Sequence, residues 1–148
     1  LYDNLKVSEY MEFFAACYHL EGFEARKCAR SLLEQVGLGD RKDAFVDGLS
    51  RGMQQRLCLA RALIHDPELL IMDEPSRGID VGAKHEIYEI MNDLAAQGKS
   101  IIMVSSEMAE LFGMSDRVYV MCDGKMRGEI KDKKDMTQAK VMSYATQF

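Results

Sequence analysis

The chain has 148 residues, of which 47% are hydrophobic, so it is long enough and apolar enough for one globular domain with a sizeable core. Its 19 Lys and Arg residues against 24 Asp and Glu residues give a formal net charge of -5, which argues against non-specific nucleic-acid binding as its main task. Its longest apolar runs are far shorter than the roughly 20 residues of a membrane-spanning helix.

The first part of the chain is expected to be helical. Apolar residues recur at helical spacing from Ser8 to Leu20, with Ser8 as the N-cap, and a second amphipathic stretch runs from Glu24 to Val36. Ser50 opens a third predicted helix, which Pro67 stops because proline cannot continue a helix.

The rest of the chain alternates between short apolar strands and amphipathic helices, a pattern typical of a parallel sheet covered on both faces. The turn Asp123-Gly124 predicts a hairpin between the last two strands. We therefore predict an α/β fold. Its expected elements are strands at 69–72, 100–105, 117–121 and 125–130, helices at 81–97 and 108–113, and a terminal helix after a charged linker at 131–135.

The four cysteines are scattered along the chain, without a Cys-x-x-Cys pair and without a histidine at zinc-ligand spacing. They are predicted to be reduced and mostly buried thiols, because a free cysteine behaves as a small hydrophobic residue. They are Cys17, Cys28, Cys58 and Cys122.

Two adjacent carboxylates follow the first predicted strand, at the end where open α/β sheets bind ligands. In phosphoryl-transfer sites, an acid in this place steadies Mg²⁺, and a neighbouring acid orients and deprotonates the attacking water. Asp73 suits the first role and Glu74 the second. Taken alone, the pair is more often a solvated turn or a helix cap, and the surrounding segments decide between these readings.

The start of the third helix has a composition suited to a phosphate. Segment 49–56 places the Ser50 hydroxyl and the small Gly52 where free backbone N–H groups and the helix dipole favour an anion. Taken alone, Ser50 is more often only an N-cap. Together with Asp73-Glu74 and segment 76–80, however, this helix start resembles the ABC ATPase family, with signature motif, Walker B strand, catalytic glutamate and D-loop in order.

This resemblance implies a P-loop NTPase-like core with a helical subdomain, and it assigns roles to residues. Asp73 would hold Mg²⁺, and Glu74 would be a catalytic base. The expected domains are a helical subdomain with the signature motif at 1–62, a core part at 63–130, and a linker with a C-terminal helix at 131–148. The residues implied to bind ATP are Ser50, Arg51, Gly52, Met53, Gln54 and Asp80.

The two halves of the chain resemble different branches of that family. Segments 2–10 and 49–53 are similar to exporter cassettes that pair with a separate permease. From Ser76 onward, segments 76–84 and 105–107 are similar to the second cassette of monosaccharide importers. Import and export are therefore both open at this point.

Two departures from the family pattern concern the nucleotide. These 148 residues contain no Gly-x-x-x-x-Gly-Lys-Ser/Thr loop, and Gly98-Lys99-Ser100 ends a predicted helix and opens a strand. With the Walker A part missing, the chain alone is expected to bind MgATP weakly or not at all and to be inactive. Glu107 occupies the place where the family resemblance puts a switch histidine, and a carboxylate there would repel the γ-phosphate. The alternative is that Glu107 is an ordinary acid at a helix start.

The resemblance also implies partners and a location. A second ATP-binding cassette would pair head to tail with this one, a transmembrane permease would dock on the helical subdomain, and the protein would lie peripherally on the cytoplasmic face of the cell membrane. No nucleic-acid partner is expected. The alternatives are a soluble ABC ATPase acting on ribosomes or DNA, and a truncated interaction module without catalysis. We also expect strand 69–72 to expose an apolar patch and the chain to self-associate.

Overall fold

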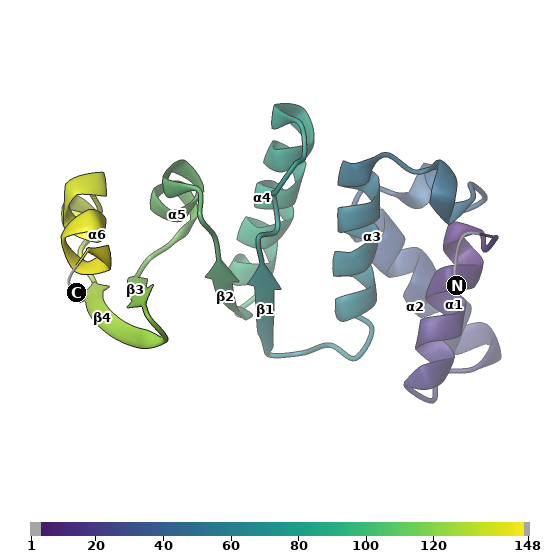
Figure 1. Ribbon diagram of the computed structural model, residues 1–148. Helices are drawn as coiled ribbons and strands as arrows, with labels where there is room; N and C mark the ends of the chain where they lie inside the picture. The colour runs from purple at the N-terminus through teal and green to yellow at the C-terminus, as the bar shows by residue number, and fades with distance from the viewer. Residues whose placement is uncertain (1–3, 147–148) are drawn as a thin grey trace. The chain divides into compact units, whose positions relative to one another are not determined.

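The computed structural model describes residues 4–146, so residues 1–3 and 147–148, which belong to the predicted first and last domains, lie outside the described part. The chain divides into two compact units, one up to Met103 and one from Val104 on, and each is described by itself. Figure 1 labels the elements. In chain order they are α1 (Val7–Cys17), α2 (Gly22–Gln35), α3 (Arg51–Ala62), β1 (Leu69–Asp73), α4 (Val81–Ala96), β2 (Ser100–Val104), α5 (Met108–Met114), β3 (Val118–Cys122), β4 (Lys125–Ile130) and α6 (Gln138–Ala145), with short 3-10 turns at Gly39–Arg41, Val46–Gly48 and Lys133–Asp135.

Helix α1 begins two residues earlier than predicted, at Val7, and its N-cap is Lys6 rather than Ser8. The Glu9 carboxylate accepts a hydrogen bond of 2.8 Å from the Lys6 N–H, so an acid in the first turn stabilises a helix start that has no good capping side chain. The helix also ends at Cys17 rather than Leu20, because His19 adopts a left-handed φ of 63°.

Helices α2 and α3 form where the sequence predicts them, although α2 begins at Gly22 rather than Glu24 and ends at Gln35 rather than Val36. Gly37 follows α2 with a φ of +66°, the left-handed conformation that glycine adopts without strain. Ser50 is the N-cap of α3, as predicted, and this helix ends at Ala62, before Pro67.

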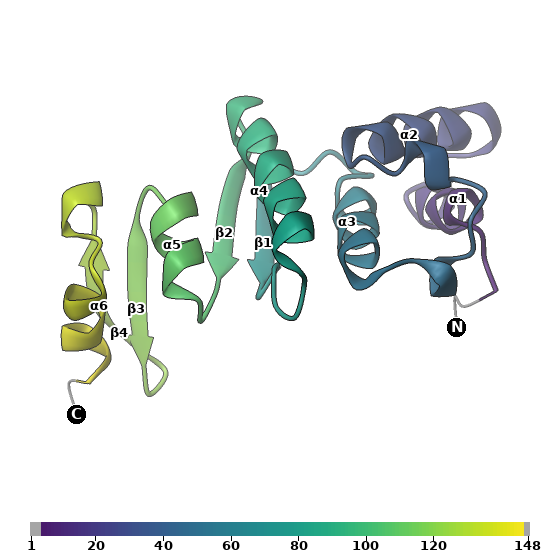
Figure 2. The same cartoon turned by 90° about the horizontal axis from the view of Figure 1, so that it is seen from above.

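The core of the first unit lies among α1, α2 and α3 and extends to one face of β1 and to α4. Figure 2 shows β1 and β2 running side by side in the same direction, with α4 alongside them. Leu70 on β1 is buried in the same apolar cluster as Ile90 and Leu94 on α4. The β1–α4–β2 connection therefore forms the expected parallel α/β unit.

The other side chains of these two strands form the apolar patch expected from the sequence. Leu69 is 47% exposed, Ile71 is 71% exposed, and Ile102 on β2 is 51% exposed. Because successive side chains of a strand point to opposite faces, burial of Leu70 against α4 leaves Leu69 and Ile71 on the open face. We call Leu69, Ile71 and Ile102 the open-face patch.

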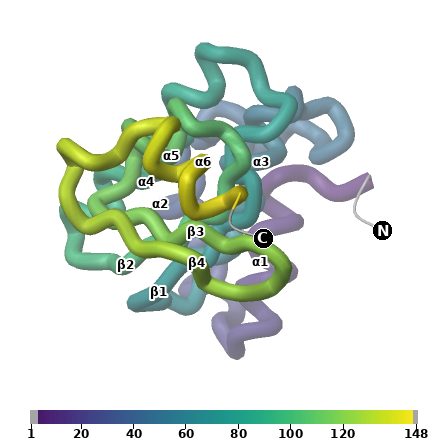
Figure 3. Tube along the Cα trace, turned by 60° about the vertical axis from the view of Figure 1, so that its left-hand side comes forward, coloured from purple at the N-terminus to yellow at the C-terminus, as the bar shows by residue number. Residues whose placement is uncertain are grey.

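The second unit contains the predicted hairpin. Strand β3 pairs antiparallel with β4, and the turn residues Asp123 and Gly124 have φ values of 50° and 69°, as a type I′ turn requires. Figure 3 shows α6 beside this hairpin, where Val141 joins Val118, Val120 and Ile130 in a small core. The strand predicted at 117–121 thus belongs, within residues 4–146, to a hairpin and not to the β1–β2 sheet.

The prediction of mostly buried thiols is wrong for two cysteines. Cys17 and Cys58 are exposed, whereas Cys28 and Cys122 are partly buried, and all four are free. Cys17 is the last residue of α1 and Cys58 lies on the outer face of α3, so helix position outweighs the general tendency of cysteine to be buried. Among the described residues, no helix is long and apolar enough to cross a membrane.

Candidate functional site

The first element of the candidate site is the N-terminal turn of α3. The Ser50 Oγ accepts a hydrogen bond of 3.3 Å from the Met53 N–H, and the Ser50 carbonyl accepts one of 2.9 Å from the Gln54 N–H. The Gln54 side chain reaches back to the Val46 carbonyl at 3.5 Å. Ser50, Arg51 and Gln54 are exposed, so this turn presents polar groups to solvent at the positive end of a helix.

The second element is the carboxyl end of β1. Asp73 is the last residue of the strand and is exposed. Glu74 has a φ of +46°, in the left-handed region that a residue with a Cβ rarely adopts, and its carbonyl accepts a hydrogen bond of 3.1 Å from the Arg77 N–H. Backbone outliers of this kind cluster at functional sites, and this one falls on the predicted base.

The third element is loop 76–80, which joins β1 to α4. The Ser76 carbonyl accepts a hydrogen bond of 3.3 Å from the Ile79 N–H, so the loop is a tight turn with Gly78 at a φ of +69°. The Asp80 Oδ1 accepts a 3.0 Å bond from the Ala83 N–H and thereby caps α4. Ser76 is 1% exposed, and its hydroxyl has no hydrogen-bond partner within residues 4–146.

The structure brings the first and third elements together. A Cβ added to Gly52 would lie 2.5 Å from the Ala83 Cβ and 3.4 Å from the Ile79 Cγ2, so the α3 turn packs directly on the start of α4. A Cβ added to Gly78 would lie 2.8 Å from the Arg51 Nη1. Sequence reasoning gave neither Gly78 nor Ala83 a role of its own, although the small residues at 52, 78 and 83 were a signal of close approach.

Glu107 belongs to the second unit, where it is the N-cap residue of α5. Its backbone N–H donates to the Ser105 Oγ at 3.0 Å, which fixes the loop that leads into the helix. The exposed Ser106 precedes it in the same loop and is a further polar side chain to which the sequence reasoning gave no role. The predicted role of Glu107 near a γ-phosphate stays a prediction.

The described residues contain no group of three or more His, Cys, Asp or Glu side chains that could hold a metal ion. This composition does not suit a closed protein cage for a cation. Mg²⁺ is usually bound through one or two carboxylates together with phosphate oxygens and waters. Asp73, exposed at the strand end, would be the carboxylate that holds it.

Arg56, on the second turn of α3, is a structural residue whose contacts the sequence did not predict. Its Nη1 donates to the carbonyls of Val36 at 3.0 Å and Gly37 at 3.3 Å, and its Nη2 pairs with the Glu86 carboxylate at 3.2 Å. The guanidinium therefore connects the end of α2 and helix α4 to the helix that carries Ser50.

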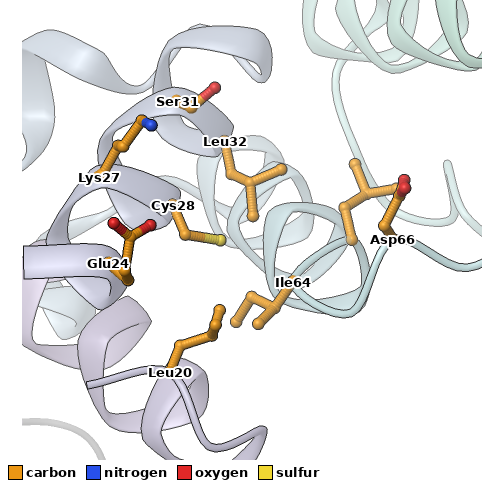
Figure 4. Close-up of a pocket in the computed structure, with 9 residues that line it drawn as sticks. Leu20, Glu24, Lys27, Cys28, Ser31, Leu32, Ile64 and Asp66 are labelled. Atoms are coloured by element: carbon orange, nitrogen blue, oxygen red, sulfur yellow. The ribbon is translucent and has the colours of Figure 1, made fainter.

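A hollow of about 360 Å³ lies elsewhere in this unit, between α2 and the end of α3, and Figure 4 shows its lining. The Cys28 sulfur points into it near Leu32 and Ile64, and burial raises the pKa of that thiol. None of the predicted site residues lines this hollow, so it is separate from the candidate site.

Comparison with known proteins places these features in a family. The sequence pattern of the ABC transporter family matches residues 1–77. A galactose/methyl galactoside import ATP-binding protein of Clostridium tetani is 56% identical over 103 residues, which are 70% of this chain and 20% of that protein. A xylose import ATP-binding protein of Moorella thermoacetica is 51% identical over 104 residues, which are 70% of this chain and 20% of that protein.

A second galactose/methyl galactoside import ATP-binding protein, from Photobacterium profundum, is 46% identical over 121 residues, covering 82% of this chain and 23% of that protein. This chain thus spans 20% to 23% of the length of these curated relatives. Among solved structures, the ADP conformation of an ATP-binding cassette of an ABC transporter matches 99% of this chain and 65% of its own, with a TM-score of 0.86. At 21% identity this likeness shows the fold alone.

Proposed function

Because this chain belongs to the ABC transporter family, we propose that it is part of an ATP-binding and ATP-hydrolysing subunit of a membrane transporter. The observation that carries the proposal is the close packing of the start of α3, at Gly52, on Ile79 and Ala83, which follow the carboxylates Asp73 and Glu74 in the chain. A solvated turn or a simple helix cap would not require Gly52 to pack on Ala83 or Gly78 to pack on Arg51.

In this proposal each residue at the strand end has its own task. Asp73 holds Mg²⁺, which neutralises negative charge on the phosphates when bound. Glu74 orients the attacking water and takes its proton. Ser50, Gly52 and the N-terminal turn of α3 bind the phosphates of a nucleotide held by a second cassette. Glu107 slows turnover at the site of its own chain.

The proposed partners are a second ATP-binding cassette and a transmembrane permease, with this protein on the cytoplasmic face of the membrane. The relatives described above are named as import ATP-binding proteins for galactose, methyl galactoside and xylose. We therefore favour import of a monosaccharide over export. By themselves, these 148 residues would not turn over ATP, because they contain no phosphate-cradling Gly-x-x-x-x-Gly-Lys loop.

The test replaces Glu74 by Gln in the assembled transporter. The amide keeps the size of the side chain and its hydrogen bonding but cannot accept the proton, so ATP turnover and uptake of labelled galactose or xylose should fall by ~10² or more. Nucleotide binding should stay unchanged.

Glu68→Gln is the matched control, because Glu68 is an exposed acid just before β1, at the opposite end of the strand from Glu74. It should leave turnover and uptake at the wild-type level. If Glu74→Gln turns over ATP as fast as the wild type, the proposed hydrolytic role is wrong. If ATP is hydrolysed normally but no sugar enters, the proposal of monosaccharide import is wrong.

A further inference from the structure

Arg51 is the first residue of α3, and its guanidinium lies against the backbone of Gly78 in the loop that follows Glu74. A Cβ built on Gly78 would lie 2.8 Å from the Arg51 Nη1, 2.9 Å from its Cζ and 3.2 Å from its Nη2. All three distances are shorter than ordinary van der Waals contact, so a side chain at residue 78 would displace the guanidinium from this position. The φ of +69° at Gly78 disfavours any other residue for a second reason.

This guanidinium has no other partner within residues 4–146. It makes no hydrogen bond and no ion pair with a described residue, although it carries five N–H donors. The planar guanidinium offers more surface for such a contact than the compact ammonium of lysine. The contact with Gly78 is therefore what holds this side chain in place.

Beside this contact, Gly52 and Ala83 bring the same two segments together. The Ala83 Cβ and the Ile79 Cγ2 occupy the space that a side chain at residue 52 would need. Ile79 also closes the turn of the loop through its N–H, which donates to the Ser76 carbonyl at 3.3 Å. The loop is thus contacted at Gly78 by a charged side chain and at Ile79 by the backbone surface of the α3 turn.

We propose that Arg51 is a positioning residue that holds loop 76–80 on the first turn of α3 and thereby fixes Glu74. The path from the loop to Glu74 is short, because the Arg77 N–H donates to the Glu74 carbonyl at 3.1 Å. This inference rests on the proposed ATPase function for its effect on turnover. It differs from the role suggested by sequence, in which Arg51 binds the nucleotide directly.

The first test measures the loop itself and does not depend on ATP hydrolysis. Amide hydrogen exchange of residues 77–80 should become about tenfold faster in Arg51→Ala, because the loop loses a contact that restricts its local opening. Arg51→Lys keeps the charge but not the planar group, so exchange in this variant should be faster than in the wild type and slower than in Arg51→Ala. Arg51 is exposed, and neither variant should unfold the chain.

Arg30→Ala is the control, since Arg30 is an exposed arginine on α2 that takes part in none of these contacts. It should leave exchange of residues 77–80 unchanged. If Arg51→Ala exchanges at the wild-type rate in this loop, the inference is wrong, whatever the transporter does.

The second test separates positioning from direct nucleotide binding by steady-state kinetics of the assembled transporter. Loss of a positioning residue should lower kcat for ATP hydrolysis by roughly tenfold and leave KM for ATP unchanged. A raised KM with an unchanged kcat would show that Arg51 contacts the nucleotide and would overturn the inference. A wild-type transporter without ATP turnover would refute the proposed function, and the exchange measurement would then decide the positioning role alone.

Discussion

Glu74 combines two unfavourable backbone features. Its φ of +46° lies in the left-handed region, where a residue with a Cβ costs about 1–2 kcal/mol, and it precedes Pro75, which favours an extended conformation for the residue before it. Pro75 and Ser76 are fully buried, so the packing of the next two residues holds the strained conformation in place. The left-handed conformation places the carboxylate in a tight turn and not in a continued strand.

At the same scale, Asp66 and Lys99 make an ion pair whose effect on stability should depend on pH. The Lys99 ammonium donates a hydrogen bond to the Asp66 carboxylate and, at 3.0 Å, to the Pro67 carbonyl. This hydrogen bond, followed by the positive charge of Lys99, lowers the pKa of the Asp66 carboxyl. Because the folded state binds the proton more weakly than the unfolded chain, the carboxylate stabilises the fold at neutral pH.

We expect the wild type to have a larger free energy of unfolding than Asp66→Asn at pH 7. The difference should be complete above the ordinary carboxyl pKa of about 3.9 and should disappear as the pH falls through the lowered pKa of the folded state. Urea titrations from pH 7 to acid measure it. In a Lys99→Gln background the same substitution should lose this pH dependence, and an unchanged dependence there would assign the effect to another group.

At the scale of elements, Arg56 connects three helices. Its side chain is 11% exposed, whereas its partner Glu86 is 50% exposed, so the guanidinium is the buried member of the pair. The carbonyls of Val36 and Gly37 lie at the end of α2, where backbone acceptors have no partner in the helix itself. Arg56 therefore donates hydrogen bonds from the middle of α3 to the carbonyls at the end of α2.

Arg56→Ala should lower the free energy of unfolding by about 2–4 kcal/mol, because it leaves the buried Val36 carbonyl without a donor and removes a packed side chain. Glu86→Gln should cost less than about 1 kcal/mol, since exposed ion pairs contribute little. Urea unfolding of both variants against the wild type is the measurement. Equal losses in the two would mean that the ion pair, and not the carbonyl contacts, carries the stabilisation.

The sequence predicted these elements well where a local signal exists. Ser50 before an apolar helix and Asp123-Gly124 between two strands specify a cap and a turn through their own chemistry, and both are confirmed. The cap of α1 was missed because an acid three residues inside the helix stabilises it, and Lys6 carries no capping signal. In the candidate site, the motif order predicted a role for Asp73 and another for Glu74, and both roles stay predictions.

The contacts between segments were beyond sequence reasoning. Arg51 meets Gly78, and Arg56 meets Val36, across long stretches of chain, and these pairings depend on how helices pack and not on spacing. Residue type alone also favoured burial of Cys58, but this residue lies on an exposed face of α3. Predicting such features requires the three-dimensional arrangement. Successive residues of a helix point in directions only about 100° apart, so a small rotation of the helix decides which of them is buried.

At the scale of the whole molecule, the open-face patch should govern self-association. Exposed apolar side chains on neighbouring strands favour contact with another apolar surface. The weight-average mass of the 148-residue chain in sedimentation experiments should therefore rise with concentration. Ile71→Lys places a charge in the middle of the patch and should keep the chain monomeric.

Phe23→Lys is the matched control, because Phe23 is 70% exposed, like Ile71, but lies on α2, outside the patch. It should associate as the wild type does. A wild-type chain that remains monomeric at every concentration would contradict the expectation, and suppression by both lysine variants would point to net charge and not to this surface.

The contact between Gly52 and Ala83 also limits how the sequence can drift. The two positions share one small volume, since a Cβ at residue 52 would fall 2.5 Å from the Cβ at residue 83. Glycine cannot become smaller, so a larger residue at position 83 cannot be compensated at position 52. A residue with a Cβ at position 52 is tolerated only when Ala83 becomes glycine. A mutational path through Gly52→Ala alone passes through a poorly packed intermediate, whereas a path that first converts Ala83 to Gly does not. The order in which substitutions accumulate is thus constrained by a single van der Waals contact.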